Sequence, residues 1–461
     1  MKKGDELILK IEKMKYPNIG IGYVNDKKVH VKNVLSGQTV RCRISKNRSE
    51  KRIGRLLEVV EPSAEEQNSF CEHYGLCGGC LFQTLSGENQ LRAKFDMVKL
   101  LFDEAGIEVP LDTIMESPSL FEYRNKMEFS FGDEIKDGPM TLGMHKKGRY
   151  HDVVTVDKCH LVDEDYRVIL RAVLDYACEQ KLPKFNKNTF EGFLRHLVIR
   201  KSYVTGEILI GLSASTQPIY EDGTLFNQAE FVNLLRGLPL KGEIIGVLYI
   251  KNDGVSDVVQ GEYDVLYGRD FLYEKLFDLT FKVSFYAFFQ TNTAGAEKLY
   301  ESALDLIPEL EGKLALDLFS GTGTIGQIMS KKAKQVIGVE IVEDAVASAR
   351  ENMMLNSIEN CEFHCGDVFK VLSEMTLSPD VIVVDPPRSG MGEKTSIKIA
   401  GYGVEEILYI SCNPKTLLED LMVLSRQGYE PVKMHLVDMF PWTGSVESVC
   451  LLKKVSLNDS L

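Results

Sequence analysis

One cysteine of this chain stands where an open α/β enzyme would place a nucleophile. The apolar run at residues 407–410 predicts a short buried strand, and Cys412 follows it, directly before an Asn-Pro turn. Ligands of doubly wound sheets bind at the carboxyl ends of the strands. A thiolate there can add to C6 of a pyrimidine, which makes C5 carbanion-like and able to attack a methyl donor. Most lone cysteines are small buried hydrophobes, but the strand-end position favours the nucleophile.

The C5 proton of such an adduct must leave, and its removal requires a separate general base. Glu447 begins the last predicted strand and alternates with apolar neighbours. A surface glutamate is the default interpretation of such a residue, and its candidacy as the base rests on the family resemblance given below. Asp385 opens an Asp-Pro-Pro-Arg sequence after another apolar strand at 381–384. This sequence resembles the loop of amino-methyltransferases that flip a base, but those enzymes place an aromatic residue where Arg388 stands. Asp385 is therefore placed to hydrogen-bond a uracil edge, with N-methylation as the alternative.

A glycine-rich turn predicts a nucleotide-cofactor site at the same edge of the sheet. Asp317 ends a predicted strand, and the glycines of 321–326 nominally match the dinucleotide pattern G-x-G-x-x-G. Glu340 follows about 20 residues on, where an acid binds ribose hydroxyls, and Asp367 is placed to meet an adenine amino group. Asp317 and the lack of a phosphate-binding basic residue favour S-adenosylmethionine (SAM), which carries no phosphate.

Four cysteines predict a metal centre. Cys71, Cys77 and Cys80 lie within ten residues, with paired glycines between the last two, and Cys159 is the candidate fourth ligand. A [4Fe–4S] cluster takes four thiolates, and zinc also accepts four. The spacing matches neither a zinc ribbon with two C-x₂-C pairs nor the radical-SAM motif, so the residues alone leave an iron–sulfur cluster and zinc both open.

The elements that position these residues fall into three regions. Short alternating runs in residues 1–62 predict a small OB-like β-barrel. The pattern of residues 121–280 predicts mostly strands and turns of an α+β domain. From 313 to 455 it predicts strands that alternate with helices. Residues 1–60 hold 15 Lys/Arg against 6 Asp/Glu, although the whole chain has a net charge of −13. A basic module on an acidic body predicts a localised RNA or DNA contact.

The expected cellular compartment is inferred from the lack of a predicted membrane span and signal peptide. No apolar stretch reaches the ~18 residues of a membrane span, and the first residues do not form a signal peptide. A cytoplasmic protein is expected, so its ten cysteines are unsuited to structural disulfides.

Together these motifs resemble, over essentially the whole chain, the RNA uracil-5-methyltransferases, and within them the 23S rRNA branch. The resemblance implies a TRAM barrel that binds RNA, a central domain with a [4Fe–4S] cluster, and a Rossmann-like SAM-dependent catalytic domain. Cys412 would be the nucleophile and Glu447 the general base, with Asp385 beside the target base. The implied SAM positions are Gln290, Phe319, Glu340 and Asp367, and the implied cluster ligands are Cys71, Cys77, Cys80 and Cys159.

The expected protein is therefore a multidomain α/β enzyme. Its predicted domains are a TRAM-like barrel (1–62), a central iron–sulfur domain (63–82 and 116–280) and a catalytic domain (83–115 and 281–461). It would form 5-methyluridine in 23S rRNA, as a monomer without an obligate protein partner. The barrel and the cluster favour ribosomal RNA, because the transfer-RNA branch normally lacks both. A transfer-RNA uridine methyltransferase and an iron–sulfur RNA-binding protein with a degenerate SAM domain remain the alternatives.

Overall fold

The N-terminal domain of the computed structural model is β-rich, as predicted. The structure describes residues 1–48, 51–219, 226–373 and 378–455. The strands of this domain are β1 (Glu6–Lys10), β2 (Lys13–Lys15), β3 (Ile19–Val24), β4 (Lys27–Lys32), β5 (Thr39–Arg48) and β6 (Lys51–Glu61). They form one sheet in the order β1-β5-β6-β4-β3-β2. Fully buried Ile11, Val29, Val31 and Val40 fill its interior, since alternate residues of each strand face inward.

The central domain is a seven-stranded sheet with two helices packed on it. Its strands are β8 (Lys126–Asp133), β9 (Met140–Lys146), β10 (Arg149–Thr155), β11 (Leu194–Lys201), β12 (Glu207–Ala214), β13 (Glu243–Lys251) and β14 (Tyr263–Gly268). The strand order is β10-β9-β8-β11-β12-β13-β14. The helices α2 (Glu164–Glu179) and α3 (Gln228–Arg236) share one apolar core with the sheet. A hairpin, β15 (Phe271–Leu276) and β16 (Leu279–Ser284), leads on toward the last domain.

The C-terminal domain is a doubly wound α/β sheet. Its main strands are β17 (Leu314–Leu318), β18 (Gln335–Glu340), β19 (Cys361–Cys365), β20 (Val381–Val384), β21 (Glu406–Ser411), β22 (Tyr429–Val437) and β23 (Glu447–Lys454). Its helices are α4 (Thr293–Asp305), α5 (Thr324–Met329), α6 (Glu343–Leu355), α7 (Val368–Ser373), α8 (Glu393–Ala400) and α9 (Pro414–Arg426). β17 to β21 are mutually parallel, and β23 runs antiparallel between β21 and β22. Helices cover both faces, so a strand such as β20 is buried throughout.

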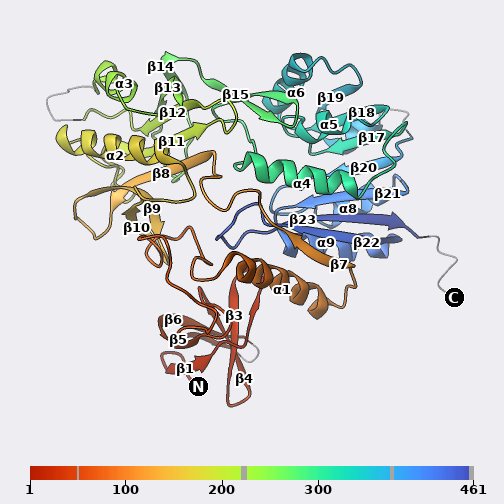
Figure 1. The fold of residues 1–461 in the computed structure, drawn as a ribbon, viewed down its shortest axis with the longest axis horizontal. Coiled ribbons are helices and arrows are strands. Elements are labelled where there is room, and N and C mark those ends of the chain that lie inside the picture. Colours follow the sequence, from red (N-terminus) through yellow and green to blue (C-terminus); the bar gives the residue numbers. More distant parts are fainter. Residues whose placement is uncertain (49–50, 220–225, 374–377, 456–461) are drawn as a thin grey trace.

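An early segment completes this last sheet. α1 (Gly87–Ala105) packs beside it, and β7 (Leu111–Met115) pairs in parallel with β22 as the edge strand. Inside this junction Lys94 of α1 forms a fully buried ion pair with Asp438, whose other carboxylate oxygen accepts a hydrogen bond of 2.7 Å from Gln90. Figure 1 shows α1 lying between the β-rich N-terminal domain and the catalytic sheet.

In the described part of the chain, no helix is long and apolar enough to cross a membrane.

Candidate active site

Cys412 and Glu447 come together through the register of two neighbouring strands. β21 and β23 are antiparallel, and Ser411 lies opposite Ser448. One step further along the register places Cys412 opposite Glu447, at the strand ends where ligands of such sheets bind. Glu447 is only 5% exposed, whereas the Cys412 side chain is half-buried and open to an incoming group.

The two side chains share one electrostatic environment. Burial raises the pKa of Glu447 to about 8, with a further increase from Asp385 and an opposing effect of Arg388. Burial likewise raises the pKa of Cys412 to about 11, and the Glu447 carboxylate adds to this increase. Arg388 lowers the pKa of Cys412 through its charge and through a hydrogen bond. The guanidinium of Arg388 is therefore the group that favours both the thiolate and the carboxylate.

Arg388 is held in place by the turn that follows Cys412. Asn413 Nδ2 donates to the Arg388 carbonyl at 3.0 Å, and Thr416 Oγ1 donates to the same oxygen at 3.3 Å. Further on in this loop, Asp420 of α9 accepts from the backbone N–H groups of Met391 and Gly392 at 2.7 and 2.9 Å. The sequence interpretation used Arg388 only as evidence against N-methylation, because nothing local shows that it reaches the thiol.

The glycine-rich turn forms a tight loop after β17. Phe319, Gly321 and Gly323 have positive φ angles of 64°, 53° and 74°. A Cβ atom on Gly323 would lie 2.6 Å from the ring of Phe363, so this position requires glycine both for its backbone and for its space. The turn thus packs closely against the neighbouring strand and exposes its backbone at the sheet edge.

Glu340 ties this loop to the next strand end. Its Oε2 accepts from Gly321 N at 3.0 Å, and its Oε1 accepts from Ile341 N and Val342 N at 2.8 and 3.0 Å. Each carboxylate oxygen has further acceptor capacity, as ribose hydroxyls would need. Ile341 and Val342 expose 69% and 53% of their surface beside it, which is apolar area that a bound adenosine would cover.

Asp317 supplies a buried acceptor under the loop. Its Oδ2 accepts from Gly326 N at 2.8 Å, while Oδ1 has no hydrogen-bond partner among the described residues. Burial raises the pKa of this carboxyl to about 8, and Asp385 and Glu340 add to the increase. Ser320 Oγ is likewise buried and without a partner in that part of the chain. These acceptors fit a cationic cofactor such as SAM, because a nearby positive charge would favour the ionised form of Asp317.

Gln290 lies at the junction with the central domain and next to a buried tyrosine. Asn125 Nδ2 donates to the Gln290 carbonyl at 3.1 Å and to Thr293 Oγ1 at 2.9 Å. The Gln290 side chain also forms a hydrogen bond with Tyr300 of α4. Burial raises the pKa of Tyr300, and Asp385, Glu447 and Asp317 all contribute to the increase. Tyr300 therefore lies among the three site carboxyls, which no local motif indicates.

The structure gives Asp367 a local role at a helix start. Its Oδ1 accepts from Phe369 N and Lys370 N at 3.1 and 3.2 Å, so it caps α7 just after β19. Its side chain is exposed at the same sheet edge. The predicted contact with adenine stays a prediction.

The four predicted cluster cysteines gather beside the central sheet. The 71–80 loop is docked on the β9–β10 hairpin, since Gly78 N donates to the His145 carbonyl at 3.0 Å. Burial raises the pKa of Cys80 to about 12, and the other three cysteines each add to this increase. All four are free thiols. No group of three or more side chains in the described ranges is already arranged around a metal position, so the cluster stays a prediction.

Comparisons with known proteins agree with this geometry. The family described as tRNA (uracil-5-)-methyltransferase matches residues 86–455. An uncharacterised RNA methyltransferase of Clostridium acetobutylicum is 44% identical over 456 residues, covering 98% of this chain and 99% of that protein. One from Caldanaerobacter subterraneus is 43% identical over 456 residues, covering 98% of this chain and 100% of that protein.

A solved structure extends the likeness to the whole fold. The crystal structure of Pyrococcus abyssi tRNA (uracil-54, C5)-methyltransferase in complex with S-adenosyl-L-homocysteine superimposes with a TM-score of 0.75. The two sequences are 25% identical, and the match covers 96% of this chain and 99% of that one. The family resemblance drawn from the sequence is therefore confirmed: the chain belongs to the RNA uracil-5-methyltransferase family, whose members are SAM-dependent RNA methyltransferases.

Proposed function

We propose that this protein methylates C5 of a uridine in 23S ribosomal RNA through a covalent bond between Cys412 and C6. The observation that carries the proposal is the register that sets Cys412 opposite the buried Glu447. An enzyme that methylates an exocyclic amine needs no thiol at this point. A C5 enzyme needs a nucleophile for one side of the C5–C6 bond and a base for the proton that leaves C5.

The reaction begins with a uridine flipped out of its stack, because a C5 atom inside a helix is out of reach. The Cys412 thiol gives its proton to solvent and its sulfur adds to C6, which moves an electron pair toward C5. Bound SAM would supply an electrophilic methyl group to C5 and would leave as S-adenosyl-L-homocysteine when its sulfur–methyl bond breaks. Glu447 then accepts the C5 proton, the C6–sulfur bond breaks, and the pyrimidine double bond is restored with the thiolate released. We propose that Asp385, whose pKa burial raises to about 7, hydrogen-bonds the uracil edge.

Gln290, Phe319, Glu340 and Asp367 are proposed to hold SAM. The loop at Phe319 and the acceptors of Glu340 support this assignment, as does the unpartnered oxygen of Asp317 among the described residues. The N-terminal domain is proposed to act as a TRAM domain, because its 15 basic residues in 1–60 suit an RNA backbone. A degenerate SAM domain is not favoured, since the loop, the nucleophile and the base occur together.

The substrate is tested by mapping 5-methyluridine. Total RNA from cells that lack the gene would be incubated with the purified protein and SAM, digested, and analysed by mass spectrometry. New 5-methyluridine in 23S rRNA is the expected result. The matched family is named for tRNA (uracil-5-)-methylation, and the solved relative is a tRNA (uracil-54, C5)-methyltransferase, so transfer RNA is the second candidate. Methylation of transfer RNA alone would overturn the ribosomal assignment and keep the chemistry.

Cys71, Cys77, Cys80 and Cys159 are proposed to hold a [4Fe–4S] cluster that shapes the RNA-binding surface. Protein purified without oxygen should contain about four iron and four sulfide ions per chain. Cys80→Ser should lose most of this iron, because replacing one thiolate removes a quarter of the ligands. Cys178→Ser is the matched control, since Cys178 is an exposed thiol on α2. Stoichiometric zinc without sulfide would contradict the cluster and indicate a four-cysteine zinc site.

A further inference from the structure

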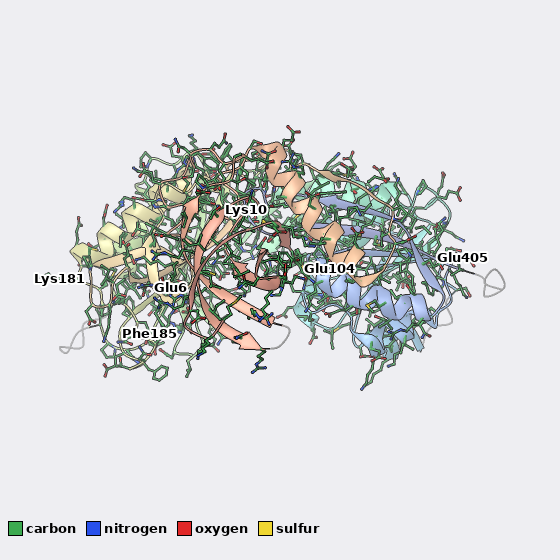
Figure 2. All side chains as sticks on the ribbon, turned by 90° about the horizontal axis from the view of Figure 1, so that it is seen from below. Glu6, Lys10, Glu104, Lys181, Phe185 and Glu405 are labelled. Carbon is green, nitrogen blue, oxygen red and sulfur yellow. The ribbon has the colours of Figure 1, made fainter. Side chains whose placement is uncertain are left out.

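A turn of the N-terminal domain packs against the C-terminal domain beside the loop that leads to Glu447. Tyr16 lies between β2 and β3, is only 9% exposed, and belongs to the same apolar core as Tyr409 and Val446 of the catalytic domain. β2 also packs against α1, where Lys15 and Glu104 form an ion pair. Figure 2 shows the β-rich domain and α1 side by side on this face, with Glu104 at the end of the helix.

The same turn lies on the loop that leads to the general base. A Cβ atom on Gly444 would lie 1.9 Å from Asn18 Nδ2, so the Asn18 amide packs directly on the Gly444 backbone. Gly444 stands three residues before Glu447. Asn18 Oδ1 is buried and accepts no hydrogen bond from any described residue. A buried amide oxygen left without a donor is uncommon and indicates a missing partner.

Like Asn18 Oδ1, the hydroxyl of Tyr16 has no hydrogen-bond partner among the described residues. Two other buried tyrosines of the same core donate to protein groups: Tyr409 to Asp420 at 2.6 Å and Tyr429 to the Val404 carbonyl at 2.7 Å. The Tyr16 hydroxyl has no such partner within the described residues. Burial raises the pKa of Tyr16 to about 12, and the charges of Glu447 and Cys412 contribute to this increase. At neutral pH the hydroxyl is thus a protonated donor that lies within the electrostatic range of both catalytic groups.

We propose that this turn completes the active site, with the Tyr16 hydroxyl donating a hydrogen bond to an oxygen of the flipped uridine nucleotide. The inference rests on the proposed function. A nucleotide offers acceptor oxygens on its base, ribose and phosphate, so it suits a neutral donor beside the reacting carbon. Asn18 Oδ1 is the matching acceptor for a nucleotide hydroxyl or imino group. The N-terminal domain would then act in the chemical step as well as in holding RNA.

The test is Tyr16→Phe, which keeps the ring and removes only the hydroxyl. The rate of methyl transfer in a single turnover and the rate of adduct formation on 5-fluorouridine RNA would be measured, using the RNA that the wild-type protein methylates. We expect both rates to fall by about 10- to 100-fold, the scale for one lost transition-state hydrogen bond. SAM affinity and the melting temperature should stay at wild-type values. Tyr23→Phe is the control, because Tyr23 lies on β3 and is 41% exposed.

Equal rates for Tyr16→Phe and wild type would overturn the inference, even if Tyr16→Ala were slow, because ring packing would then account for the residue. A wild-type protein that forms no 5-methyluridine would instead refute the proposed function on which the inference rests. Rates that fall in Tyr16→Phe while Tyr23→Phe and the melting temperature are unchanged would establish the contact.

Discussion

Cys412→Ala is expected to reduce 5-methyluridine formation by at least about 10⁴-fold, the scale of loss when a covalent nucleophile is removed. The reason is electronic. C5 of a free uracil is too weak a nucleophile to take a methyl group, and only the bond from sulfur to C6 makes it reactive. Single-turnover assays with mass-spectrometric detection of the nucleoside would measure the loss. SAM binding should persist, because the cofactor loop after β17 does not depend on the thiol.

The control for this variant is Cys178→Ala, an exposed thiol far along the chain from the catalytic strands, which should keep full activity. Total methyl transfer to RNA that survives in Cys412→Ala and gives an N-methylated nucleoside would remove the covalent mechanism. It would favour the amino-methyltransferase interpretation of the Asp385–Arg388 sequence, which requires no thiol.

Glu447→Gln should separate the two halves of the reaction. Methyl transfer to C5 needs no base, so the variant should form a methylated RNA adduct on Cys412 that resolves about 10²- to 10⁴-fold more slowly than in the wild type. Denaturing gels would show a protein–RNA band, and mass spectrometry would show the added methyl group. The double variant with Cys412→Ala should give no such band. A Glu447→Gln protein that turns over normally would place the base elsewhere.

The pH dependence follows from the same residue. Only the ionised carboxylate accepts the C5 proton, and the pKa of Glu447 is raised to about 8. The rate at which the wild-type Cys412–RNA adduct breaks down to product should therefore increase as the pH rises toward about 8. Above that pH the rate should stay constant. Arg388 lowers the pKa of both Glu447 and Cys412. In Arg388→Ala the increase in the rate of adduct breakdown should therefore occur at higher pH than in the wild type.

The sequence indicated the parts of the site that follow directly from a strand end. Cys412, Asp385 and the 321–326 turn each come after an apolar run, and their places at strand ends were predictable from the local pattern. Tyr300 and Tyr16 gave no such signal. A tyrosine on an amphipathic helix or in a turn looks like ordinary packing, and only the folded chain brings these rings to the carboxyls and the thiol.

The placement of residues 83–115 shows the same limit at the level of the fold. Their assignment to the catalytic domain came from the family resemblance, because the short run that becomes β7 has mixed polarity and no strong period. Pairing with β22 is what makes it a strand. Asp367 shows the converse: its place after a strand was readable, but its role as the cap of α7 depends on the following turn. The domain boundaries themselves stay predictions.

Because α1 and β7 complete the catalytic sheet, that sheet can form only after the C-terminal strands have been synthesised. The hydrogen bond from Gln90 to Asp438 joins residues that are 348 positions apart, so the ribosome finishes the early segment long before its partner exists. Until then α1 can pack against the N-terminal domain, including β2, but not against the C-terminal sheet. A fragment that begins at residue 281 would leave β22 as an open edge, prone to pairing with other chains. The methyltransferase unit is thus not a detachable module, because residues 281–461 alone lack the edge strand β7 and the partners of Asp438.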